Sequence, residues 1–219
     1  MEHKLVLEKI FKRIPLMKKA ISDPARHEKI LSFVSNECKS VNDALYMIDL
    51  GLLKAVHESI SHEDERVVSL VVRLLGHIIG IDRESSAIFD LVLNEHASLL
   101  NFVFGQLESS KVDEIPAALK FGIIESIGSI VKSNHAFNWI RLNQPCLQQL
   151  CDSLNDTNLF IANATCKTIY EFDIVLGKLY SMFDTKENYC NALELLWNLS
   201  EIKMTEIHII NEKLKRKPP

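Results

Sequence analysis

Cysteine and histidine are the side chains that could hold a metal ion, but their spacing argues against a site. Cys146 and Cys151 are five residues apart, with no Cys-x-x-Cys pair and no His pair nearby, whereas zinc sites need such closely spaced ligands. His57 and His62 are also five apart, which places them on diverging faces of a helix. We therefore expect no metal and no cofactor.

Motifs for covalent catalysis are also missing. The sequence has no Gly-x-Ser-x-Gly elbow and no glycine-rich phosphate loop. The acidic run Glu63-Asp64-Glu65 is typical of a solvated turn before a helix, where the helix dipole favours acids. We therefore expect that the protein is not an enzyme.

Trp139 and Asn143 form the most specific binding pattern in the chain. They resemble the Trp-x-x-x-Asn motif that nuclear-import adaptors repeat along a peptide groove, where Trp rings form pockets for basic side chains and Asn holds the peptide backbone. One repeat earlier the pair is Val92 and His96, and Trp197 has no Asn four residues later. A packed core tryptophan is the favoured interpretation, and Trp139, Asn143 and Trp197 are the candidate partner-binding residues.

Charge is unevenly distributed along the 219 residues, whose formal net charge is −4. Residues 1–30 hold eight basic and four acidic side chains, and residues 211–219 hold four and one; the other 180 hold 13 and 24, a net −11. An acidic body suits a basic protein segment better than nucleic acid, although solubility alone also explains it. Four basic residues of the tail resemble a nuclear import signal: Lys213, Lys215, Arg216 and Lys217.

Elements that would position these residues follow from an internal repeat. The pattern of Leu52–Ile60 returns at 99–107 and 146–154, an offset of 47 both times. Its apolar spacing (i, i+1, i+4, i+8) is one face of a helix. Armadillo and HEAT helical repeats have periods of about 40–47 residues, so the sequence predicts an α-solenoid.

A second helix follows in each unit. Val67–Ile79 is rich in β-branched residues, as a strand would be, but polar residues recur every three or four positions at Arg66, Ser69, Arg73 and His77. One narrow polar stripe on an otherwise apolar segment indicates a helix packed between neighbours.

The predicted fold is all-α: an armadillo/HEAT-like α-solenoid of about three full repeats with capping helices. Only seven Gly and six Pro, no apolar run long enough for a membrane span and no secretory signal support a single intracellular domain without membrane contact. The five cysteines are expected to be reduced core residues. The expected parts are an N-terminal cap (1–48), repeat 1 (49–94), repeat 2 (95–142), repeat 3 (143–183), C-terminal helices (184–210) and a basic tail (211–219).

Individual helices are also expected from local signals. These are Lys4–Ala20, Pro24 to about Asn36 after the N-cap Asp23, Val41–Asp49, about Arg83–Asn94, a proline start at Pro116, His135–Leu142, an extension from Phe172 to about Phe183, and Tyr189–Ser200.

Four stretches resemble the N-terminal helical-repeat region of the animal family of ATM-kinase activators associated with the breast-cancer susceptibility protein. They are Leu52–Ile60, His135–Ile140, Ser153–Ala162 and Asn191–Leu196, and the register covers roughly residues 16–200. The resemblance implies a non-enzymatic scaffold, nuclear and cytoplasmic, linked to DNA-damage signalling and to the nuclease subunits of the Integrator complex. Family members are much longer, and their contact with the Integrator nuclease lies in their C-terminal part.

The functional hypothesis is therefore a protein-binding scaffold whose partners are proteins such as ATM kinase or Integrator nuclease subunits. Two alternatives share the fold: a co-chaperone that clasps Hsp70 and accelerates ADP release, and an adaptor that binds basic peptides in its concave groove.

Overall fold

A computed structural model of the chain describes residues 23–108, 115–141, 149–150 and 153–180. These residues form helices and no strand, so the all-α prediction is confirmed for them. The contacts divide the chain into two units, residues 1–168 and 169–219. The helices are α3 (Pro24–Glu37), α4 (Val41–Asp49), α5 (Leu52–Ser59), α6 (Glu65–Ile81), α7 (Ala87–Glu95), α8 (Ala97–Glu108), α9 (Ala117–Ile130), α10 (Asn134–Arg141), the 3₁₀ turn Ser153–Asn155 and α12 (Leu159–Tyr180).

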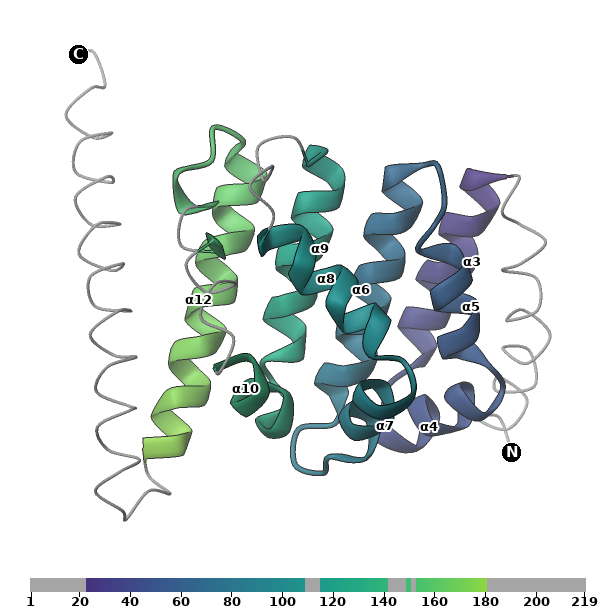
Figure 1. Ribbon diagram of the computed structural model, residues 1–219, viewed down its shortest axis with the longest axis horizontal. Coiled ribbons are helices and arrows are strands. Elements are labelled where there is room, and N and C mark those ends of the chain that lie inside the picture. The colour runs from purple at the N-terminus through teal and green to yellow at the C-terminus, as the bar shows by residue number, and fades with distance from the viewer. Residues whose placement is uncertain (1–22, 109–114, 142–148, 151–152, 181–219) are drawn as a thin grey trace. The chain divides into compact units, whose positions relative to one another are not determined.

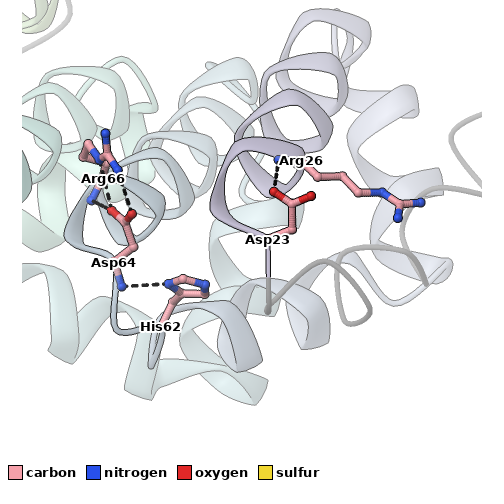
Figure 2. Close-up of polar contacts among 5 residues, drawn as sticks. All are labelled: Asp23, Arg26, His62, Asp64 and Arg66. Carbon is pink, nitrogen blue, oxygen red and sulfur yellow. Dashed lines mark hydrogen bonds and ion pairs between the residues drawn. The ribbon is translucent and has the colours of Figure 1, made fainter.

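Aspartates cap two of the long helices, as Figure 2 shows. Asp23 Oδ1 accepts a hydrogen bond from Arg26 N (3.1 Å), and Asp64 Oδ1 accepts one from Arg66 N (2.9 Å). Each carboxylate satisfies a backbone donor that the first helical turn leaves free. The predicted N-cap at Asp23 is confirmed, and α6 forms although its valines favour strands.

The segment before α7 corrects one predicted boundary. A helix was expected from about Arg83, but α7 begins at Ala87. The cause is Asp82, whose carboxylate accepts hydrogen bonds from Ser85 N (3.1 Å), Ser85 Oγ (2.6 Å) and Ile88 N (3.1 Å). A buried aspartate that bonds nearby backbone N–H groups holds the intervening residues in a loop.

Within the first unit α3, α6 and α9 lie side by side, and α6 is the central one (Figure 1). α6 also contacts α4, α5 and α7. Apolar residues of α6 are completely enclosed, among them Val67, Val71, Val72, Leu75 and Ile78. The prediction that this apolar helix packs between neighbouring helices is confirmed.

Glycines bring α6 and α9 unusually close together. A Cβ atom on Gly76 of α6 would lie 2.6 Å from the Cα and the carbonyl oxygen of Ser126 on α9. The arrangement is reciprocal, because Gly122 of α9 faces Ser69 of α6 in the same way. Because a glycine of each helix faces a serine of the other, the two helices can approach this closely only when these pairs are aligned.

α9 is joined in turn to the start of α12. Thr168 Oγ1 donates a hydrogen bond to the carbonyl oxygen of Ile124 (3.0 Å), and Lys120 Nζ lies 2.7 Å from Asp156 Oδ2 just before α12. The order of helices across this side of the first unit is therefore α3, α6, α9 and the first turns of α12.

Several predictions fall on residues outside the described ranges. They are the helix Lys4–Ala20, most of the third copy of the repeat (146–154), the last helix Tyr189–Ser200, and the tail residues Lys213, Lys215, Arg216 and Lys217. In the described part, no single helix is long and apolar enough to cross a membrane; the bent pair of α7 and α8 meets that requirement only when its two helices are taken together.

Candidate partner-binding face

Two hollows lie along α6, one at each half of the helix, and both are lined by Leu70. The first, here called the N-terminal hollow, has a volume of about 420 Å³; the second, the C-terminal hollow, has about 380 Å³. Side chains of α3, α6 and α9 line both, and the start of α12 reaches only the first. Pockets that enclose ligands span roughly 300–1,000 Å³, so each hollow is large enough to take a side chain of a partner.

The N-terminal hollow is mostly apolar on its α9 and α12 side. Phe121 of α9 is half-buried, Ile161 of α12 is buried, and Phe160 beside it is 77% exposed. An aromatic ring that remains largely in water at the edge of a concave surface is typical of a protein interaction site.

Charged groups border the same hollow where α3 and α6 begin. Glu28 comes from α3 and Arg66 from α6. Arg66 donates to Asp64 through Nε (3.2 Å) and Nη2 (2.9 Å), drawn in Figure 2. These bonds lower the pKa of Asp64 to about 2, and together with Glu28 they raise the pKa of Arg66. The positive charge of Arg66 is therefore shared by two carboxylates, because it is hydrogen-bonded to Asp64 and also interacts with the negative charge of Glu28.

The C-terminal hollow is polar. Beside Leu31, Leu70 and Leu74, its lining groups are hydroxyl, amide, imidazole and ionic side chains of three helices: Ser32, Ser35 and Asn36 of α3, Arg73 and His77 of α6, and Glu125 and Ser129 of α9.

Two interactions fix the cationic and imidazole groups of this hollow. Arg73 Nη2 lies 3.1 Å from Glu125 Oε2, and the guanidinium carbon lies 5.6 Å from the centre of the Phe121 ring. His77 Nε2 bonds to the carbonyl oxygen of Cys38 (2.7 Å), so it joins α6 to the end of α3. Groups of this kind can bond to a peptide backbone.

Trp139 lies elsewhere and lines neither hollow. Its ring meets Phe104 of α8 and Phe89 of α7 edge to face, with centroids 5.3 and 6.0 Å apart. These contacts are those expected of a packed aromatic residue. Asn143 and Trp197 lie outside the described residues, so the prediction that the three bind a partner stays a prediction.

The histidines and cysteines that could bind a metal do not gather at one site among the described residues. His57 is exposed, and His62 Nδ1 accepts a hydrogen bond from Asp64 N (2.8 Å). Among the described residues no group of three His, Cys, Asp or Glu is placed to hold a metal ion. Cys38 is a free cysteine, and burial with the nearby Asp43 raises the pKa of its thiol to about 12.

The sequence contains a signal for the hollows that periodicity alone presents as a packing feature. The polar stripe Arg66, Ser69, Arg73 and His77 lines them, one pair in each hollow. Phe160 was not identified, because the apolar pair Leu159-Phe160 at a helix start does not differ from a core pattern until exposure is known.

No family model matches this sequence, and no curated protein matches it. The resemblance to the ATM-activator family therefore gains no support from these comparisons and stays a prediction.

Proposed function

We propose that this chain is a non-enzymatic scaffold that binds a polypeptide segment across the face formed by α3, α6, α9 and the first turn of α12. The observation that carries the proposal is the pair of hollows that meet at Leu70. One is apolar with an exposed aromatic edge and the other is polar, which is the division expected of a surface that binds both side chains and backbone.

The arrangement of the helices is part of the same proposal. The offset of 47 residues between sequence copies and the side-by-side packing of α3, α6 and α9 support an armadillo/HEAT-like array. In such an array equivalent helices line one face, so a bound segment crosses several repeats and collects small contributions from each.

Site-specific photo-crosslinking tests this proposal. A photoreactive amino acid that replaces Leu70 should crosslink a protein from nuclear or cytoplasmic extract, while the same group in place of the exposed Lys54 on α5 should not. Equal crosslinking from both positions, or none from Leu70, would contradict the proposed face.

The identity of the crosslinked protein then distinguishes the scaffold hypothesis from its two alternatives. ATM kinase or Integrator nuclease subunits would support a DNA-damage or RNA-processing scaffold, as the family resemblance implies. Hsp70 would support the co-chaperone alternative, which also requires faster release of a fluorescent ADP analogue from Hsp70. Basic nuclear cargo would support the adaptor alternative.

A further inference from the structure

The N-terminal hollow combines an apolar end and an acidic end on one surface. Phe121, Phe160 and Ile161 lie on α9 and α12, and Glu28 lies on α3 at the other side of α6. Because the helices follow in the order α3, α6, α9, α12, an occupant that spans the hollow meets the carboxylate at one end and the aromatic rings at the other.

Among the large apolar side chains that the structure describes, Phe160 is the most exposed. It is 77% exposed, whereas Ile161 next to it is 2% exposed. Covering a phenylalanine that is mostly in water removes a large apolar area, and each fully buried side chain of this size contributes about 1.5–3 kcal/mol. An apolar side chain of a partner is the natural counterpart.

The charge of the hollow favours a cation at the α3 end. Glu28 lines the hollow together with Arg66, and Asp64, which lies outside the lining, is hydrogen-bonded to the same guanidinium, so two carboxylates share one cation. The N-terminus of α9 contributes the opposite sign, but only about half a charge that fades within one turn. The 180 residues between positions 30 and 211 add a long-range attraction for cations through their net charge of −11.

We propose that the N-terminal hollow docks a basic segment of a partner protein that places one large apolar side chain against Phe121 and Phe160 and a Lys or Arg side chain against Glu28. This inference rests on the proposed function and specifies its partner. The polar C-terminal hollow then faces the backbone of the same segment.

Selection from a library of random peptides displayed on phage, with the whole chain as bait, tests the proposal. The expected result is enrichment of peptides that pair an aromatic residue or Leu with Lys or Arg. In fluorescence anisotropy, selected peptides should bind the variants Phe160→Ser and Glu28→Lys about tenfold more weakly than the original chain.

Two variants serve as matched controls. Leu159→Ser removes a neighbour that is 71% exposed but does not line the hollow, and Asp49→Lys reverses an exposed charge on α4. Both should bind within about twofold of the original chain. A reciprocal charge reversal shows whether the Glu28→Lys variant is still folded. A peptide with Glu in place of its Lys or Arg should bind the Glu28→Lys variant more tightly than it binds the original chain.

Each contrary outcome has its own meaning. Enriched peptides that are acidic, or that bind Phe160→Ser as tightly as the original chain, overturn this inference but leave the scaffold proposal in place. Enrichment of no peptide at all, with no crosslinking from Leu70, overturns both.

Discussion

His27 of α3 is completely enclosed, and its surroundings stabilise the uncharged imidazole. Its Nε2 shares a hydrogen bond with Ser59 Oγ on α5 (3.2 Å), Nδ1 has no hydrogen-bond partner, and its ring meets the ring of His62 edge to face, 5.6 Å between centroids. Burial, and then the nearby His62, lower the pKa of His27 below the ordinary value of 6.5. The contact between α3 and α5 therefore depends on a neutral side chain.

Acidification should destabilise the protein through His27. In the unfolded chain His27 binds a proton near pH 6.5, while the folded protein resists protonation. Below that pH the unfolded state binds more protons, so the free energy of unfolding falls. Urea unfolding at about pH 7.5 and about pH 5.5 should show this loss, and the loss should be smaller in His27→Gln. Identical pH dependence in the two proteins would contradict the assignment.

Lys120 and Asp156 form a largely enclosed ion pair, with side chains 8% and 15% exposed. Asp156 Oδ1 also accepts a hydrogen bond from Asn158 N (2.8 Å). Burial raises the pKa of Asp156, but Lys120 and the Asn158 amide lower it more, so the net pKa is lowered. The pair ties α9 to the residues before α12 and so helps to place Phe160.

Removal of the Lys120 ammonium should leave a poorly solvated carboxylate. We expect Lys120→Met to lower the free energy of unfolding by about 1–3 kcal/mol. The double variant Lys120→Met with Asp156→Asn should recover part of that loss, because the unpaired charge is gone. Additive losses in a double-mutant cycle from urea unfolding would mean that the two side chains do not interact.

At the scale of elements, the contact of α6 with α9 is the most constrained one. Its glycines face serines in both directions, so an added methyl group has no space at either helix. An exposed glycine, Gly105 of α8, offers the opposite situation, because a Cβ atom there would meet no atom within 4 Å.

Matched alanine substitutions should therefore have opposite effects. Gly76→Ala forces α6 away from Ser126 and should destabilise the protein by about 1–3 kcal/mol. Gly105→Ala replaces the poorer helix former without a clash and should stabilise it by up to about 1 kcal/mol. Thermal unfolding of the two variants provides the comparison. A Gly76→Ala protein as stable as the original would show that the two helices can separate without loss.

Helices were predictable from the sequence where a local signal determines them. Asp23-Pro24 marks the start of α3, and the polar stripe identifies α6 in spite of its valines. The predicted start of α7 was wrong. The helix begins where the buried Asp82 carboxylate accepts hydrogen bonds from Ser85 and Ile88, and the periodicity of the sequence holds no information on those bonds. The candidate face was not predicted, since concavity depends on how α3, α6 and α9 pack. Trp139 drew attention by its residue type, but its neighbours Phe89 and Phe104 come from other helices.

At the scale of the whole molecule, net charge governs which partners can approach. At the N-terminal hollow one cation, Arg66, is shared by Glu28 and by Asp64 beside the hollow, and the middle of the chain carries a net −11. Attraction between a basic segment and such a surface weakens as salt screens it.

Affinity for a selected basic peptide should therefore fall when salt is raised from about 0.05 M to about 0.3 M, chiefly through slower association. A single-stranded RNA or duplex DNA probe should show no binding to the whole chain at physiological salt in an electrophoretic mobility assay. A shifted band that disappears with added salt would mean that the basic ends of the chain, rather than its acidic middle, determine its partners.

The reciprocal glycine and serine contacts of α6 with α9 also bear on how fast a partner can bind. Residues on these two helices form most of the N-terminal hollow, and where Gly76 meets Ser126 and Gly122 meets Ser69 the helices approach through the smallest side chains. We therefore expect the base of the hollow to be preorganised, so that a ligand binds without a preceding conformational change. Observed association rates should rise linearly with ligand concentration without reaching a plateau, and differences in affinity among ligands should arise from their residence times.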